Sequence, residues 1–343
     1  MSLTEVHKTE DAQFKVVWIE VGRQLPAYAV RNFKLTQKLH KSIGQLLVTD
    51  SNRKIDFLQV IHEKVVPKSD KTKKFMGLKK DWPFKQEDFW LGTTKRFFHL
   101  YDLMLHLDLK NIAHLESDCI LLEEKPLLDF FNFENSKSMA YPLQAKGLGC
   151  ASILLLKSSA ILGEFLDHIL ENWLEEGAND MTLLGSFLSN DHVMELTTWP
   201  TQGSGGYFYD AGSIGHYFQG TDARNSRLPF SHRGLRDNRE GNIYNFIDRS
   251  HNTWESSVSK SDISIKVKSQ DLEGKLVNLH MHSKHIFVSS ILMSRMLRKG
   301  FNGRRSFLWR LGIFDFYVFF ERCTSFLNRR VLNKKHYISV NYR

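Results

Sequence analysis

Residues 112–118 read Ile-Ala-His-Leu-Glu-Ser-Asp, a short apolar run that ends directly in an acidic triplet. Before this run, from about Gln86 to Leu109, apolar residues recur at the spacing of one helix face. We therefore expect a long helix, then a buried strand, with Glu116 and Asp118 at the carboxyl end of that strand. Alternate side chains of an extended strand point to the same side, so the two carboxylates can meet one cation.

The first fifty residues predict the opening of a parallel sheet. Residues 14–21 form an apolar run typical of a buried strand, Ala27 to His40 has the pattern of a helix, and residues 44–50 predict a second strand. In a βαβ unit of this kind, ligands bind beyond the carboxyl ends of the strands. Glu20 and Asp50 stand at those ends and are candidate ligand contacts.

The rest of the chain continues as alternating strands and helices. The patterns predict strands at 139–143, 151–156, 263–267 and 277–281, and helices at 158–175 and 181–188. The fold class is therefore α/β, with a mainly parallel, mixed sheet flanked by helices in one domain over residues 12–290. The lysine-rich residues 64–80 are expected to form a mobile surface loop.

Charge is unevenly distributed along the 343 residues, whose formal net charge is +9. Residues 291–343 hold twelve Lys or Arg and only two acids, Asp315 and Glu321, so the remainder is close to neutral. A nucleic-acid enzyme concentrates basic groups around its main cleft because phosphate contacts dominate affinity. This distribution argues against a nucleic-acid partner.

The three cysteines do not suggest a disulfide framework or a structural zinc site. Cys119 and Cys150 both lie in strand-like apolar runs and are expected to be small core residues. No close cysteine pair with histidine partners occurs, as a structural zinc site requires. Few cysteines and a polar, charged amino-terminal stretch favour the cytoplasm.

A second group of metal-binding residues follows late in the chain, where residues 278–285 contain three histidines and a lysine. His280 and His282 share one side of the predicted strand, and a neutral imidazole is a competent manganese ligand. Nucleotide-bound Mg²⁺ or Mn²⁺ is usually held by one or two carboxylates with phosphate oxygens and water. His280 and His282 are therefore candidate metal ligands beside Glu116 and Asp118.

These motifs resemble the GT-A nucleotide-sugar glycosyltransferases, whose Asp-x-Asp motif follows a buried strand and binds the metal of a nucleotide diphosphate sugar. Here Glu116 stands where the commoner motif has aspartate. The segment from His280 to Lys284 is similar to the late His and Lys segment of glycogenin-like and lipopolysaccharide-galactosyltransferase-like members, although their wider pattern is not reproduced. The resemblance implies that one of the two histidines, His280 or His282, completes the metal site. It also implies a metal-dependent hexosyltransferase that moves a sugar from a UDP-linked donor to a hydroxyl of a glycan or lipid-linked acceptor.

The resemblance also implies roles for single residues in donor binding. The run from Thr93 to Phe97 is similar to a family helix whose basic residue approaches the donor, so Arg96 is a candidate contact for the diphosphate or nucleotide. Lys284 is expected to contact the diphosphate, and Ser117 lies within the same donor site.

Three acids are candidates for the catalytic region that faces the acceptor hydroxyl or the sugar. Asp180 has this role by resemblance, or else serves as the N-cap of the helix that begins near it. Asp191 and Asp210 are weaker candidates, and the glycines around Asp210 would allow backbone to approach a sugar closely.

The basic, aromatic-rich tail over residues 291–343 is too short and too interrupted by charge to span a bilayer. A helical tail of this kind suits the surface of an anionic membrane, which would make the protein peripheral. A helix that packs on the catalytic domain or mediates dimerisation is the alternative.

Two other functions compete with the glycosyltransferase hypothesis. A nucleotidyltransferase that makes nucleotide sugars would show a glycine-rich phosphate loop after the first strand, and residues 21–26 match that pattern poorly. A non-catalytic, membrane-associated scaffold would keep the fold but lack metal-dependent nucleotide-sugar binding.

Overall fold

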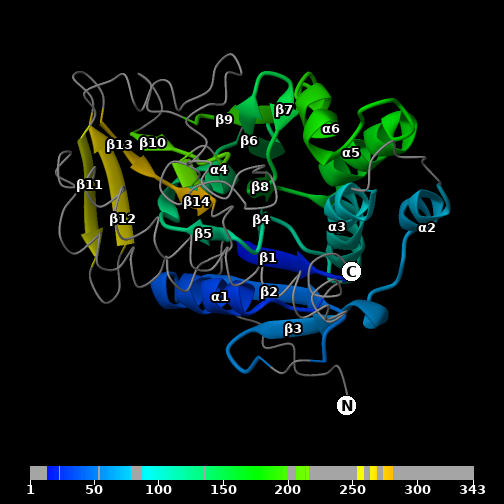
Figure 1. The fold of residues 1–343 in the computed structure, drawn as a ribbon, viewed down its shortest axis with the longest axis horizontal. Helices are drawn as coiled ribbons and strands as arrows, with labels where there is room; N and C mark the ends of the chain where they lie inside the picture. Colours follow the sequence, from blue (N-terminus) through cyan, green and yellow to red (C-terminus); the bar gives the residue numbers. More distant parts are fainter. Residues whose placement is uncertain are drawn as a thin grey trace, which may run out of the picture.

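The structure has three layers, with helices on both sides of a central sheet (Figure 1). The computed structural model describes residues 14–22, 24–52, 55–78, 87–134, 136–198, 206–212, 214–215, 253–258, 263–268 and 273–280. Its central sheet has the strand order β3-β2-β1-β4-β8-β6-β7, and β9 pairs with β6. The strands are β1 Lys15–Glu20, β2 Gly44–Thr49, β3 Gln59–His62, β4 Ile112–Leu115, β6 Met139–Ala145, β7 Leu148–Gly149, β8 Ile153–Leu156 and β9 Val193–Leu196.

Strand directions in this sheet determine which loops meet at each edge. β3, β2, β1 and β4 pair in parallel, and β9 pairs in parallel with β6. β8 runs antiparallel to both of its neighbours, β4 and β6, and β7 runs antiparallel to β6. The predicted α/β class, with a mixed and mainly parallel sheet flanked by helices, is confirmed.

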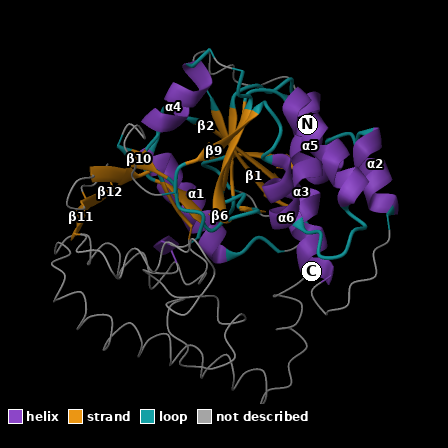
Figure 2. Ribbon diagram, turned by 90° about the horizontal axis from the view of Figure 1, so that it is seen from above, coloured by secondary structure: helices purple, strands orange, loops and turns teal. Residues whose placement is uncertain are grey.

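Helices cover both faces of the sheet because its central strands are apolar on both sides (Figure 2). In β1, Val16 and Trp18 pack on one face, and Val17 and Ile19 on the other. Helices α1 (Ala27–Leu39) and α4 (Lys125–Asn132) cover the first face. The second face is covered by α2 (Asp70–Gly77), α3 (Glu87–His106), α5 (Ser159–Asn172) and α6 (Asp180–Phe187).

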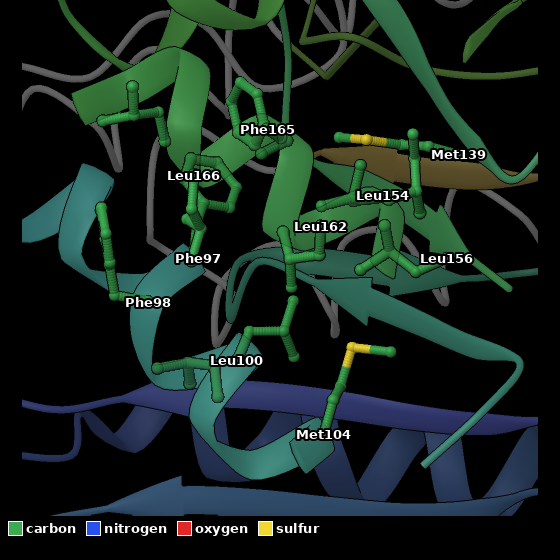
Figure 3. Close-up of a cluster of buried hydrophobic side chains, with 14 of the residues drawn as sticks. Phe97, Phe98, Leu100, Met104, Met139, Leu154, Leu156, Leu162, Phe165 and Leu166 are labelled. Carbon is green, nitrogen blue, oxygen red and sulfur yellow. The ribbon is translucent and has the colours of Figure 1, made fainter. Parts of the chain in front are cut away.

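The long helix α3 is held on the sheet by a large apolar cluster (Figure 3). Phe97, Leu100 and Met104 of α3 are buried there, and the Phe97 ring meets Phe165 of α5 edge-on at 5.3 Å between centroids. Burial of each such side chain contributes roughly 1.5–3 kcal/mol. The next residue back, Arg96, therefore projects from a helix whose position is firmly fixed.

Smaller sheets join the carboxyl-terminal part of the described chain to this core. β10 (Tyr207–Phe208), β13 (Glu273–Leu276), β12 (Ile263–Lys268) and β11 (Thr253–Val258) form one sheet. β14 (Asn278–His280) pairs antiparallel with β5 (Cys119–Leu121), the strand that follows the acidic triplet. This pairing brings two distant parts of the sequence together at one edge of the main sheet.

Several expectations differ from the structure or lie outside its described residues. The lysine-rich stretch is not a plain loop, because Glu63–Val65 forms a short 3-10 helix and Asp70–Gly77 forms α2. Ser69 starts α2 by accepting a hydrogen bond from the Thr72 backbone. His282, Lys284 and residues 291–343 lie outside the described residues. Within the described part of the chain, no helix has the length and apolar character needed to cross a membrane.

Candidate active site

The acidic triplet lies at the edge of the sheet where the parallel strands β1, β2 and β4 all end. Glu20 and Thr49, the last residues of β1 and β2, are level with each other in the ladder. Because β8 runs the opposite way, it begins at this edge, and the Glu116 backbone N–H donates to the Ser152 carbonyl at 3.2 Å. The ends of β1, β2 and β4 and the start of β8 therefore lie together at this edge.

Residues 116–118 form a tight turn, so the expectation of an extended strand through this triplet is wrong. The Cys119 N–H donates to the Glu116 carbonyl at 2.9 Å, which closes the turn between β4 and β5. From α1, the Asn32 amide donates to the carbonyls of Ser117 at 3.0 Å and Cys119 at 2.6 Å. Asn32 is a positioning residue that the sequence patterns did not reveal, since it lies mid-helix and far from the triplet.

Despite the turn, the carboxylates of Glu116 and Asp118 reach the same histidine. His280 is the last residue of β14 and pairs with Cys119 across the two-stranded ladder. Its Nε2 atom lies 2.9 Å from Glu116 Oε2 and 3.5 Å from Asp118 Oδ1. Three of the four residues expected to bind metal thus come together, and the fourth, His282, lies outside the described residues.

The charges in this cluster stabilise one another. Burial would raise the pKa of Glu116, but Arg96 and His280 outweigh it and hold this pKa well below its usual range. Burial would lower the pKa of His280, but Glu116 and Asp118 raise it well above its ordinary value. Without a metal ion the imidazolium is the counter-ion of these carboxylates, so a cation that binds His280 must displace a proton.

Arg96 links the acidic turn to α6. Its guanidinium pairs with Glu116 through Nη1 and with Asp180 Oδ2 through Nη2, the latter at 2.8 Å. Burial alone would lower the pKa of Arg96, but the two carboxylates raise it above its ordinary value. The candidate phosphate contact is therefore held in a buried ion-pair triad beside the expected metal ligands.

Asp180 belongs to this triad and does not cap its helix. Asn179 is the N-cap of α6, with its side chain accepting from Met181 and Thr182 in a capping box. Asp180 is buried, and burial raises its pKa to about 6 although Arg96 opposes the shift. Hydrogen bonds from the Thr93 side chain and the Met181 backbone to the carboxyl group also oppose the rise of this pKa.

Glycines allow α6 to lie this close to the site. A Cβ atom on Gly185 would stand 1.9 Å from the Gly147 carbonyl oxygen, in the hairpin that joins β6 to β7. Only a glycine at 185 permits this contact, which fixes the distance of α6, and hence of Asp180, from the sheet edge.

Asp210 is buried next to the site but its carboxylate binds backbone. Oδ1 accepts the N–H groups of Gly212 and Ile214 at 2.7 and 2.9 Å, and Oδ2 accepts those of Gly215 and His280 at 2.8 and 2.9 Å. A Cβ on Gly215 would lie 1.7 Å from the His280 carbonyl, so that loop passes β14 in close contact. Asp210 thereby anchors the strand that carries His280.

The other predicted residues lie in different places. Asp191 is exposed and precedes β9, which runs in the same direction as β4, so it lies at the opposite edge of the sheet from Glu116. Asp50 lies at the carboxyl edge, where its Oδ2 atom accepts the Gly22 N–H at 3.0 Å and holds the turn after β1. Glu20 is buried at the end of β1, and Ser117 is buried within the acidic turn.

The donor types fit a divalent cation. One oxygen of each carboxylate lies within 3.5 Å of the Nε2 atom of His280, and oxygen and imidazole ligands suit Mn²⁺ or Mg²⁺. Glu116, Cys150 and His280 also each offer one ligand atom within 4.8 Å of the others. The sequence interpretation of Cys150 as a core residue missed this proximity, because it depends on the antiparallel direction of β8.

No protein-family model and no curated protein sequence matches the chain. Solved structures with similarity to it include the galactosyltransferase LgtC in complex with donor and acceptor sugar analogues, at 12% identity and a TM-score of 0.37, covering 54% of this chain and 73% of that one. Another is mouse xyloside xylosyltransferase 1 in its apo form, at 10% identity and a TM-score of 0.38, covering 54% and 86%. A third is a glycosyltransferase involved in glycosylation of the major capsid of PBCV-1, at 8% identity and a TM-score of 0.29, covering 53% and 80%.

These three structures are glycosyltransferases, the class of enzyme that the motifs at 115–118 and 280–284 resemble. The arrangement of Glu116, Asp118, His280, Arg96 and Asp180 is the feature of this chain that bears on its chemistry.

Proposed function

We propose that this protein is a metal-dependent glycosyltransferase that transfers a sugar from a nucleotide diphosphate donor, UDP-linked by resemblance, to a hydroxyl of a glycan or lipid-linked acceptor. The observation that carries the proposal is the convergence of Glu116, Asp118 and His280 at the carboxyl edge of the parallel strands. Ligands of open α/β sheets bind at this edge. Contact of residues 291–343 with an anionic membrane stays a prediction.

Charge at this site matches the chemistry of the reaction. When a nucleotide diphosphate leaves a sugar, negative charge grows on its phosphate oxygens, and a bound Mn²⁺ or Mg²⁺ neutralises that charge. Glu116, Asp118 and His280 would hold the cation at the sheet edge. His280 is buried and the two carboxylates are mostly shielded from solvent, which strengthens each electrostatic contact with the donor.

Arg96 and Asp180 lie next to the proposed cation site and would help to bind the donor. Once Glu116 binds metal, its charge is shared, and the Arg96 guanidinium is free to donate its Nη1 hydrogen to a phosphate oxygen. Asp180 holds the Arg96 guanidinium through Oδ2, and we propose that it contributes to sugar positioning through this arginine. Helix α6 carries Asp180 and is kept close to the site by the contact at Gly185.

Calorimetric screening of nucleotide diphosphate sugars with and without Mn²⁺ tests the proposal. We expect at least one such sugar to bind only when Mn²⁺ is present and to be consumed slowly, with release of the nucleoside diphosphate. A nucleoside monophosphate is the matched control and should bind more weakly, because it lacks the second phosphate. Absence of nucleotide diphosphate binding in both conditions would contradict the proposal, and consumption of a nucleoside triphosphate with a sugar phosphate would favour the nucleotidyltransferase.

A further inference from the structure

Ser152 lies directly before β8 and contacts both halves of the candidate metal site. It is fully buried. Its carbonyl accepts the Glu116 backbone N–H at 3.2 Å, and its hydroxyl donates to the Asp210 carbonyl at 2.9 Å. One residue therefore holds the backbone of the acidic turn on one side and the backbone of Asp210 on the other.

Asp210 connects Ser152 to the strand that carries the histidine. The Oδ2 atom of Asp210 accepts the His280 N–H at 2.9 Å, and its own N–H donates to the Asn278 side-chain oxygen at 3.1 Å. Both of these partners belong to β14. A path of hydrogen bonds thus runs from the Glu116 backbone through Ser152 and Asp210 to the His280 backbone.

We propose that Ser152 is a positioning residue for metal binding, which sets the separation between the acidic turn and the strand that carries His280. The inference rests on the proposed function, because it names a residue that supports the same metal site. The hydroxyl hydrogen of Ser152 is donated to the Asp210 carbonyl. Ser152 therefore acts through Glu116 and His280 and is not itself a ligand.

Ser152 supplies a constraint that strand pairing alone does not. The ladder between β14 and β5 places His280 opposite Cys119, which follows the acidic turn. Glu116 begins that turn, and the contact with Ser152 holds it there. Such contacts behind the ligands matter because a displaced ligand atom binds the cation less well, and their loss typically costs about 10–100-fold in metal affinity.

Loss of the Ser152 hydroxyl should leave the fold largely intact. The Asp210 carbonyl also accepts the Asn278 amide N–H at 3.0 Å, so it keeps a hydrogen bond in Ser152→Ala. A buried acceptor is costly chiefly when it has no partner at all. The expected effect of the substitution is therefore on metal affinity more than on stability.

UDP binding to the full chain, measured by calorimetry over a range of Mn²⁺ concentrations, tests the inference. In Ser152→Ala we expect the Mn²⁺ concentration that gives half-maximal UDP binding to rise about tenfold, with parent-like UDP binding at saturating Mn²⁺. Ser152→Thr restores the hydroxyl and should restore the parent's Mn²⁺ dependence. If Ser152→Ala melts early, Ser152→Cys takes its place, because a thiol fills the same space and donates only weakly.

Tyr141→Phe is the matched control. It also removes a buried hydroxyl that donates to a backbone carbonyl, that of Leu184 at 2.6 Å. It should leave the Mn²⁺ dependence of UDP binding unchanged, since neither Tyr141 nor Leu184 belongs to the path between Glu116 and His280. An equal shift in Tyr141→Phe would contradict a specific role for Ser152.

Amide hydrogen exchange in the metal-free protein provides a readout that does not depend on metal. We expect Ser152→Ala to speed exchange of the His280 amide about tenfold, because Asp210 is less firmly held, and to leave the Trp18 amide in β1 unchanged. Tyr141→Phe should change neither rate. Parent-like exchange at His280 in Ser152→Ala would show that Ser152 does not hold β14, and would overturn the inference.

The two proposals fail in different ways. A parent that shows no Mn²⁺-dependent UDP binding would contradict the proposed function, and the inference with it. A parent that binds UDP with Mn²⁺, beside a Ser152→Ala variant with the same Mn²⁺ dependence, would overturn the inference alone.

Discussion

Arg96 is the residue on which the electrostatic balance of the site depends. Its side chain is 12% exposed, and it pairs with Glu116 and Asp180, which are 18% and 6% exposed. Removing one member of a buried ion-pair group leaves the others as uncompensated charges. A planar guanidinium bridges two carboxylates in a way that the single ammonium of lysine does not.

We therefore predict that Arg96→Ala lowers the free energy of unfolding by about 3–5 kcal/mol, and that Arg96→Lys lowers it by less. Denaturant unfolding followed by circular dichroism measures both. Lys41→Ala, at an exposed position, is the control and should change stability by no more than about 0.5 kcal/mol. Equal stability of Arg96→Ala and the parent would show that the triad does not support the fold.

His114 makes stability depend on pH. It is buried in β4, where its Nδ1 atom is 3.0 Å from the Val17 carbonyl oxygen, and burial, with a smaller effect of Arg96, lowers its pKa from 6.5 to about 4. Between these pH values the unfolded chain binds a proton that the folded chain does not. The His114 contribution to stability is therefore present above pH 6.5 and is lost as the pH falls toward 4, by up to about 3 kcal/mol.

We expect His114→Asn, which keeps a donor for the Val17 carbonyl, to make the fall in stability between pH 6.5 and pH 4 less steep than in the parent. Unfolding free energies across this range provide the measurement. The raised pKa of Asp180 makes the folded protein more stable as the pH falls through this range, which opposes the effect of His114. The contribution of His114 is therefore the difference between the curves of the variant and the parent. Identical slopes would contradict a neutral buried His114.

At the scale of elements, β14 carries His280 and is anchored by Asp210. Four backbone N–H groups converge on this one carboxylate, including that of His280 itself. An asparagine amide nitrogen cannot accept the two hydrogen bonds that one of these oxygens accepts. Each buried donor left without an acceptor costs about 1–3 kcal/mol.

Asp210→Asn should accordingly destabilise the fold by about 2–5 kcal/mol and weaken metal binding through displacement of β14. Thermal melting and Mn²⁺ titration of the same samples measure the two effects together. Asp191→Asn, the same change at an exposed position of the opposite edge, should alter neither. An unchanged melting temperature with lost turnover would instead identify Asp210 as a residue that acts on the substrate.

Local sequence was sufficient to predict the elements that frame the site. The apolar run at 112–115, the helical spacing before it and the early βαβ pattern correspond to β4, α3, and β1-α1-β2. The turn at 116–118 was not predictable, because alternating side chains do not show where β4 ends and β5 begins. The approach of Cys150, Asn32 and Asp210 depends on strand direction and non-local pairing, which neighbouring residues do not encode.

At the scale of the whole molecule, the sheet brings together residues from four separate regions of the chain: Arg96, the acidic turn, Asp180 and His280. Asp191 lies at the opposite edge of the sheet, away from this group. We propose that this carboxyl edge binds the metal of a nucleotide diphosphate donor.

Calorimetric titration of UDP into Asp118→Asn at saturating Mn²⁺ tests that claim most directly, with Asp191→Asn as the matched control at the other edge. We predict that Asp118→Asn keeps the parent's melting temperature but binds UDP at least about tenfold more weakly, because an amide is a poor ligand for a hard cation. Asp191→Asn should bind UDP like the parent. Parent-like, Mn²⁺-dependent UDP binding by Asp118→Asn would contradict the account.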